Sequence, residues 1–259
     1  WDTPFKLRDY FGYGFDALFD FPFYLSLAGD NAVNNDAILS GKLPGMGLNS
    51  ALKVAQRLYP RGAQLVRFAS NHDTNRIASE TNGDPQRERL AAAAALLLPG
   101  TPFIYYGEEI GMRGTKGPGP IYDEYRREPM DWFASETGRG MTTWFTLANR
   151  NNKPGDGISV EEQDADPGSL LNYYRALVQL RAKTPALRGN DFLVLEKDEL
   201  GACGEACFGL WRWSGSDVVL ALFNFSLQAQ TASVDLSAAP VPLAGAPMTL
   251  LGVGASSGD

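Results

Sequence analysis

The sequence contains a single histidine, His72, and only two cysteines, Cys203 and Cys207, among its 259 residues. Two thiols without a neighbouring histidine or a third cysteine do not complete the tetrahedral shell of a metal site. Long apolar runs are also missing, because the longest, Leu90–Leu98, is too short to span a bilayer. Acidic residues outnumber basic ones by 30 to 23, and the formal net charge of −7 argues against binding to nucleic acids or acidic membranes. We therefore expect neither of these partners.

The composition that remains is typical of a globular protein, with 44% hydrophobic and 11% aromatic residues. The length suits one large domain or two smaller ones. A disulfide between Cys203 and Cys207 would fit a secreted or periplasmic protein, which we favour, whereas two free thiols would fit the cytoplasm. The chain opens at Trp1 with no initiator methionine or signal peptide, so we expect a processed, excised or incomplete N-terminus.

The first half of the chain alternates between strand-like and helical patterns. In chain order we expect a strand at Ala17–Tyr24, a helix at Asn49–Tyr59, a strand at Leu65–Ala69, a helix at Pro85–Leu98 and a strand at Thr101–Tyr106. Asp84 is the expected N-cap of the second helix, with Pro85 in its first turn. Each strand with its helix is typical of one βα step of a parallel barrel or sheet.

The second half of the chain has a different pattern of secondary-structure signals. Residues Gly111 to about Gly168 are rich in glycine and proline and predict a long excursion loop. An amphipathic helix is expected at Ser169–Ala186. Short β segments are expected after it, at Phe192–Leu195, Phe208–Trp213, Val218–Phe225 and Ala232–Leu236. Only about three βα units precede this β region, and a complete barrel has eight, so we expect a partial barrel with an appended β domain.

The most informative segment is Arg67–Arg76, with the sequence Arg-Phe-Ala-Ser-Asn-His-Asp-Thr-Asn-Arg. Its apolar approach predicts a buried strand that delivers Asn71, His72 and Asp73 at its end. The carboxyl end of a barrel strand is where catalytic groups are expected. For a lone His-Asp pair, the alternative is a hydrogen-bonded structural cluster at the strand end.

Four segments, in the same order, resemble parts of the α-amylase family of glycoside hydrolases. They are Phe68–Asp73, Gly100–Met112, Arg126–Trp132 and Tyr173–Leu187, similar in turn to the family's last conserved block, its last barrel strand, the loop motif after that strand and its final barrel helix. In that family the aspartate of the first block stabilises the transition state and the histidine holds the sugar. The resemblance thus implies that Asp73 is catalytic and that His72 and Asn71 bind substrate.

The resemblance also implies the architecture. Residues 1–188 would form about strands six to eight of a (β/α)8 TIM barrel, with the loop excursion at about 111–168, and residues 189–259 a small antiparallel β-sandwich domain. The nucleophilic aspartate, the general-acid glutamate and the usual calcium ligands would lie outside this chain. We therefore expect no cofactor in the chain itself, calcium only in the absent half, and the missing N-terminal half of the barrel as a partner.

Several residues of the excursion loop could either bind substrate or stabilise the loop. Arg127, together with Asp123 and Arg126, is predicted to contact distal sugars of the substrate, and the alternative is a salt-bridged scaffold for the loop. Trp132 and Trp144 are either platforms for the flat apolar faces of sugars or anchors of the loop core.

The resemblance implies a glycoside hydrolase acting on α-glucosidic bonds of starch-like glucans or oligosaccharides by a retaining mechanism. Such a mechanism needs two carboxyl groups flanking the scissile bond, so this chain alone is expected to be inactive. Glu108 and Glu109 are expected to satisfy amides at a strand end and not to be that pair. The alternative function is a non-catalytic amylase-like scaffold, serving as a carbohydrate-binding or interaction subunit.

Overall fold

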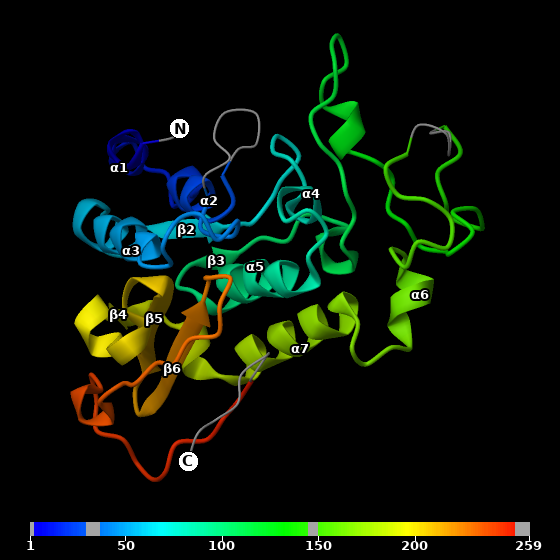
Figure 1. Ribbon diagram of the computed structural model, residues 1–259. Helices are drawn as coiled ribbons and strands as arrows, with labels where there is room; N and C mark the ends of the chain where they lie inside the picture. The colour runs from blue at the N-terminus through cyan, green and yellow to red at the C-terminus, as the bar shows by residue number, and fades with distance from the viewer. Residues whose placement is uncertain (1–2, 30–36, 145–149, 252–259) are drawn as a thin grey trace.

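The computed structural model describes residues 3–29, 37–144 and 150–251. Two three-stranded sheets organise these residues, one parallel and one antiparallel (Figure 1). The parallel sheet has the order β1 (Ala17–Phe19), β2 (Gln64–Arg67) and β3 (Thr101–Pro102). The helices of the same part of the chain are, in chain order, α1 (Pro4–Gly12), α2 (Phe21–Leu27), α3 (Gly47–Leu58), α4 (Ile77–Glu80) and α5 (Pro85–Leu97).

The start of α5 confirms the expected cap. The Asp84 carboxylate accepts hydrogen bonds from the amides of Gln86 and Arg87 at 2.9 and 3.3 Å, and Pro85 occupies the first turn. These contacts satisfy amides that have no partner within the helix.

The first and third parallel strands are shorter than expected. The strand predicted over Ala17–Tyr24 ends at Phe19, because the Asp20 carboxylate accepts a hydrogen bond from the Phe23 amide at 3.1 Å and begins α2. β3 contains only Thr101 and Pro102, although the Phe103 amide still donates to the Arg67 carbonyl at 2.7 Å. The three strands thus form a short, narrow parallel sheet.

The predicted excursion runs from η1 (Glu108–Ile110) through η2 (Glu124–Arg126) to α6 (Val160–Asp164). The helix expected at Ser169–Ala186 is α7 (Leu170–Lys183), which packs beside α5 (Figure 1). A short helix, α8 (Pro185–Arg188), follows α7 directly because Thr184 adopts an extended conformation ahead of Pro185.

The C-terminal region differs from the expected sandwich. Its described residues form one antiparallel sheet, β4 (Asp191–Val194), β5 (Cys207–Ser214) and β6 (Asp217–Asn224), with η4 (Lys197–Ala206) between β4 and β5. The strand expected at Ala232–Leu236 does not form. The Asp235 carboxylate caps η5 (Leu236–Ala238) instead. Cys203 and Cys207 form a disulfide.

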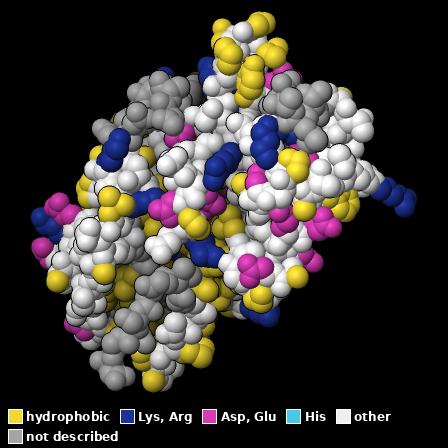
Figure 2. Space-filling view, turned by 45° about the vertical axis from the view of Figure 1, so that its right-hand side comes forward, with side chains coloured by type: hydrophobic (Ala, Val, Ile, Leu, Met, Phe, Trp, Pro, Cys, Tyr) yellow, Lys and Arg dark blue, Asp and Glu magenta, His cyan; other side chains and the backbone are white. Residues whose placement is uncertain are grey.

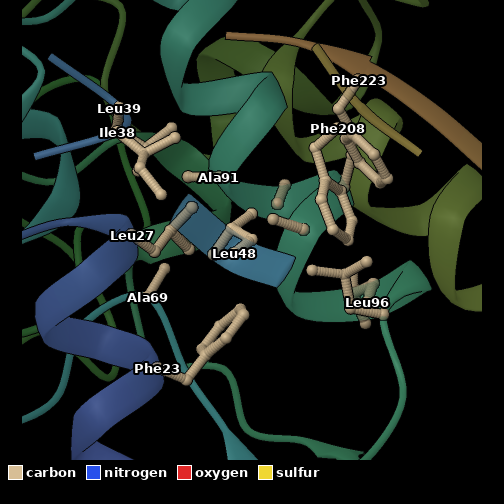
Figure 3. Close-up of a cluster of buried hydrophobic side chains, with 14 of the residues drawn as sticks. Phe23, Leu27, Ile38, Leu39, Leu48, Ala69, Ala91, Leu96, Phe208 and Phe223 are labelled. Atoms are coloured by element: carbon tan, nitrogen blue, oxygen red, sulfur yellow. The ribbon is translucent and has the colours of Figure 1, made fainter. Parts of the chain in front are cut away.

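One hydrophobic core joins the helices of the first half of the chain to the antiparallel sheet. Phe23 of α2, Leu48 of α3 and Leu96 of α5 are buried in the same cluster as Phe208 of β5 and Phe223 of β6 (Figure 3). The antiparallel sheet therefore buries one face against the helices of the parallel unit. The boundary predicted at residues 188 and 189 crosses this continuous core, and residues 252–259 of the predicted second domain lie outside the described residues.

Candidate active site

The chain leaves β2 through a tight turn that presents the His-Asp pair. The Asn71 amide donates to Thr74 Oγ1 at 2.8 Å, and the Asp73 amide donates to Asn71 Oδ1 at 2.8 Å. Asparagine side chains commonly stabilise turns by accepting a hydrogen bond from the amide two residues on. Asn71 is buried, and its side-chain oxygen stabilises the turn. The structure thus gives this residue, which we predicted to bind sugar, a turn-forming contact.

His72 and Asp73 project outward from this turn. Their side chains are 62% and 58% exposed, and His72 Nε2 lies 3.4 Å from Asp73 Oδ2. Arg127 Nη2 donates to Asp73 Oδ1 at 3.0 Å, and Arg127 Nε donates to the His72 carbonyl at 2.8 Å. The structure thus brings together three of the four predicted site side chains at the carboxyl end of β2.

Arg127 is held from its other side by the excursion loop. Its Nη2 also donates to Asp123 Oδ2 at 2.9 Å, while Asp123 Oδ1 accepts from Arg126. These two guanidinium groups hold the pKa of the exposed Asp123 carboxyl below its ordinary value. Arg127 therefore belongs both to the salt-bridged loop and to the site, because it donates to Asp123 in the loop and to Asp73 in the turn.

A buried glutamate lies behind the turn. Glu108 accepts hydrogen bonds from Ser70 Oγ at 2.6 Å and from the Tyr174 hydroxyl at 2.8 Å. Ser70 immediately precedes Asn71, so Glu108 links the turn to α7. Burial raises the pKa of the neighbouring Glu109, whose Oε2 is buried and has no hydrogen-bond partner among the described residues. The partners of the Glu108 carboxylate are thus two side-chain hydroxyls and not the strand-end amides that we expected.

Burial raises the pKa of Glu108 to about 7 from an ordinary value of 4.5, although the hydrogen bonds from Ser70 and Tyr174 lower it. Burial also raises the pKa values of Glu88 and Asp131 to about 7. A carboxyl whose pKa is higher in the folded state stabilises the fold below the unfolded pKa, and that stability is lost as the pH rises through the folded pKa.

We therefore expect the free energy of unfolding to fall as the pH rises from about 4.5 to about 7. Glu108→Gln, which replaces the protonated acid with a neutral amide, should make this decline shallower, since each pKa unit corresponds to about 1.4 kcal/mol. Urea unfolding of both proteins across that pH range measures the slopes. Equal slopes would show that Glu108 is not one of the titrating groups.

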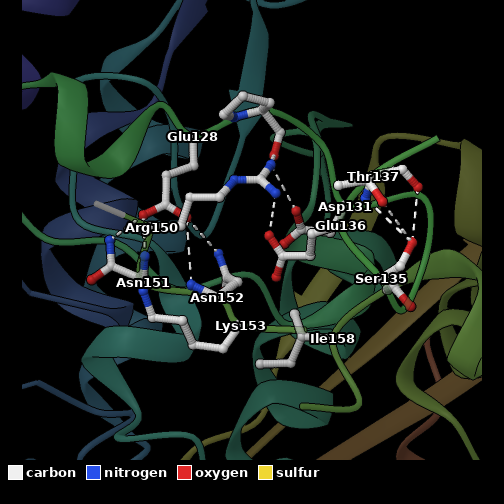
Figure 4. Close-up of polar contacts among 12 residues, drawn as sticks. Glu128, Asp131, Ser135, Glu136, Thr137, Arg150, Asn151, Asn152, Lys153 and Ile158 are labelled. Atoms are coloured by element: carbon white, nitrogen blue, oxygen red, sulfur yellow. Dashed lines mark hydrogen bonds and ion pairs between the residues drawn. The ribbon is translucent and has the colours of Figure 1, made fainter. Parts of the chain in front are cut away.

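A buried polar network orders the excursion loop farther along (Figure 4). Arg150 pairs with Glu136 and lies 2.9 Å from the carboxylate of Asp131. Glu128 accepts hydrogen bonds from the side-chain amides of Asn151–Asn152 at 2.5 and 2.9 Å. These pairs join residues up to 24 positions apart and give the loop its own polar core.

The two tryptophans of the loop are exposed. The exposed fractions of Trp132 and Trp144 are 48% and 72%, which does not fit the interpretation that they anchor the loop core. Trp132 borders an open hollow of about 730 Å³ that Arg139 and Glu161 also line. The loop tip around Ile121 projects from the body and carries further apolar side chains (Figures 1 and 2).

Within residues 3–29, 37–144 and 150–251, no group of three or more His, Cys, Asp and Glu side chains is arranged to hold a metal ion. In the same ranges no helix has the length and apolarity needed to cross a membrane.

Sequence reasoning missed the residues that support the site. Ser70 and Glu108 were not linked, and Arg76 was given no role although it closes the same ten-residue segment. The one available signal is the position of Arg76, a charged residue directly before the apolar pair Ile77–Ala78.

Comparison with known proteins places this geometry in context. The family model for the α-amylase catalytic domain matches residues 8–190. Alpha-amylase 3 of Dictyoglomus thermophilum is 36% identical over 191 residues, covering 72% of this chain and 35% of that protein. Alpha-amylase SusG of Bacteroides thetaiotaomicron is 42% identical over 118 residues, covering 46% of this chain and 16% of that protein. The chain thus spans only a minor part of the length of these curated relatives.

Solved structures agree with the sequence matches. The α-amylase from H. orenii superposes with a TM-score of 0.70 at 30% identity, covering 87% of this chain and 42% of that one. Eubacterium rectale Amy13B superposes with the same TM-score at 26% identity and with the same coverage.

Proposed function

The chain belongs to the α-amylase family of glycoside hydrolases, and from this premise we propose that the complete protein hydrolyses α-glucosidic bonds of starch-like glucans or oligosaccharides by a retaining mechanism. The observation that carries the proposal is the exposed His72–Asp73 pair at the carboxyl end of β2, with Arg127 bonded to both residues. The relatives named alpha-amylase support the substrate class.

In this proposal Asp73 stabilises positive charge. The transition state of glycoside hydrolysis resembles an oxocarbenium ion, and a fixed carboxylate beside it lowers the barrier without reorganisation. Arg127 fixes Asp73 Oδ1, while His72 offers its half-exposed ring to a sugar hydroxyl. Asn71 contributes by holding the turn that aims both side chains.

The two carboxyl groups that flank the scissile bond come, in this proposal, from outside the chain. Asp123, which shares Arg127 with Asp73, has a lowered pKa and so cannot act as a proton donor near neutral pH. Glu108 is buried against Ser70 and Tyr174 and faces away from solvent. Asp123 is therefore not assigned to the acid role, and Glu108 is assigned to neither role.

Two exposed aromatic side chains, Phe19 and Phe103, form an apolar wall on the parallel sheet and support a partner that covers it. Phe19 of β1 and Phe103 after β3 are in edge-to-face contact, with ring centroids 5.2 Å apart, and remain 40% and 47% exposed. Parallel sheets are normally covered on both faces. We propose that the N-terminal half of the barrel covers this apolar wall and supplies the remaining strands.

The test compares this 259-residue chain with the complete protein on soluble starch and maltooligosaccharides. We expect turnover by the complete protein and none by the chain alone. Gel filtration and thermal unfolding should show the isolated chain to be self-associated or non-cooperative, because its apolar wall is uncovered. Glucan binding without turnover by the complete protein would instead favour a non-catalytic scaffold, and turnover by the isolated chain would refute the half-site proposal.

A further inference from the structure

We propose that Arg76 is a positioning residue for this site: it fastens both ends of the loop 114–127 to the segment that carries His72 and Asp73, and thereby holds Arg127 against Asp73. The inference rests on the proposed function for its kinetic consequence. Its structural content, the clamp itself, stands on contacts within the described residues.

Arg76 bonds to both ends of this loop. Its amide donates to the Gly114 carbonyl at 2.9 Å, and its Nε donates to the Arg126 carbonyl at 3.1 Å. The two ends cross closely at this point, since a Cβ on Gly114 would lie 2.6 Å from the Tyr125 carbonyl oxygen and 3.3 Å from Arg76 Cδ. The loop is thus closed at its base around one residue, whose backbone amide holds the first end and whose side chain holds the second.

The guanidinium group is fixed in place by its surroundings. Arg76 is 1% exposed, and its guanidinium carbon lies 4.5 and 4.8 Å from the ring centroids of Tyr105 and Tyr106. Its Nη1 donates to the Tyr106 carbonyl at 2.7 Å. Burying a cation is costly unless its charge and donors are compensated. Two carbonyl oxygens and two aromatic faces compensate part of this cost, while Arg76 Nη2 has no hydrogen-bond partner among the described residues.

Neighbouring contacts reinforce the first arm of the loop. The Lys116 amide donates to Asn75 Oδ1 at 2.7 Å, and the Gly114 amide donates to Ser79 Oγ at 2.9 Å. Residues on both sides of Arg76 therefore bind the same arm, and the clamp ties the loop to the catalytic turn at several points.

The second arm leads directly to the site. Arg127 follows Arg126, whose carbonyl Arg76 holds, and Arg127 bonds to both the Asp73 carboxylate and the His72 carbonyl. Displacement of the Arg126 carbonyl would move Arg127 relative to Asp73. Small displacements of positioning groups can reduce turnover substantially.

The test is a double-mutant cycle in the complete protein. Arg76→Lys keeps the charge but loses the planar fork, and we expect kcat/KM on a maltooligosaccharide to fall about 10-fold. Arg127→Ala should also reduce kcat/KM. If Arg76 acts through Arg127, adding Arg76→Lys to Arg127→Ala should change kcat/KM by less than about twofold. Losses that multiply in the double variant would overturn the proposal.

Amide hydrogen exchange gives a readout that does not need activity. We expect Arg76→Lys to speed exchange in residues 114–127 selectively. Arg212→Lys is the matched control, because Arg212 is also fully buried and donates to two carbonyls, those of Leu97 and Gly189. It should leave exchange in this loop unchanged. Unchanged exchange in the Arg76 variant would refute the clamp, whereas an inactive wild-type protein with selective loop exchange would refute only the proposed function.

A milder variant covers the case in which Arg76→Lys fails to fold. Tyr106 is 40% exposed, so Tyr106→Leu should remove one ring beside the guanidinium and retain the fold. Tyr106→Phe is its control, because it keeps the ring and loses only the hydroxyl that donates to the Glu128 carbonyl at 2.7 Å. Faster loop exchange in the leucine variant alone supports the clamp, and equal exchange in the two variants contradicts it.

Discussion

Asp73→Asn in the complete protein is expected to reduce kcat on α-glucan by about 10³-fold, because it removes a fixed negative charge from beside the developing positive charge. The fold should be retained, since the Asp73 side chain is 58% exposed and its contacts are at the surface. Initial rates on maltooligosaccharides and the melting temperature are the two measurements.

Asp164→Asn is the matched control for this substitution. Asp164 is similarly exposed, at 60%, and is also ion-paired with an arginine, Arg175. Its variant should keep the wild-type rate. Wild-type turnover by Asp73→Asn would contradict the role assigned to Asp73, and equal losses in both variants would point to a general effect of removing surface charge.

The largest expected effect on stability comes from the buried pair beneath the site. Arg67 of β2 donates to the carboxylate of Asp20, and both side chains are almost fully buried. Asp20→Leu strands the Arg67 charge in the core, which should cost about 3–5 kcal/mol of unfolding free energy. Denaturant unfolding of the complete protein measures the loss.

The control for this prediction removes both charges. Asp20→Leu combined with Arg67→Met leaves no buried charge at this position, so much of the lost stability should return. Asp20 also caps α2, and losing this contact costs about 1 kcal/mol. The double variant should still show this smaller loss, because it also lacks the Asp20 carboxylate. A single variant as stable as wild type would show that the pair does not stabilise the fold.

Local chemistry made parts of this fold and site predictable. Asp84 before Pro85 marks a helix start because a side-chain oxygen and a residue without an amide suit the first turn, and α5 begins there. The segment around His72 and Asp73 was predictable as a strand end because an apolar run stops at polar residues. Both signals lie within a few positions of the feature that they predict.

The features that the sequence does not predict depend on contacts between residues far apart in the chain. Asp20 turns an apolar run into a helix by capping it, and apolar spacing alone does not distinguish the two conformations. The Asp20–Arg67 pair spans 47 positions, and the bond from Tyr174 to Glu108 spans 66. The role of Arg76 likewise depends on its hydrogen bond to the Arg126 carbonyl, 50 positions later in the chain. Such pairings follow from packing, which the pattern of one sequence does not specify.

The most direct test of the account is the anomeric form of the first product, followed by NMR as the complete protein cleaves a maltooligosaccharide. A retaining mechanism at this site predicts that the α-anomer appears first and that its formation is lost in Asp73→Asn. Initial release of the β-anomer would contradict the retaining mechanism, and turnover that survives the loss of the Asp73 carboxylate would contradict the site.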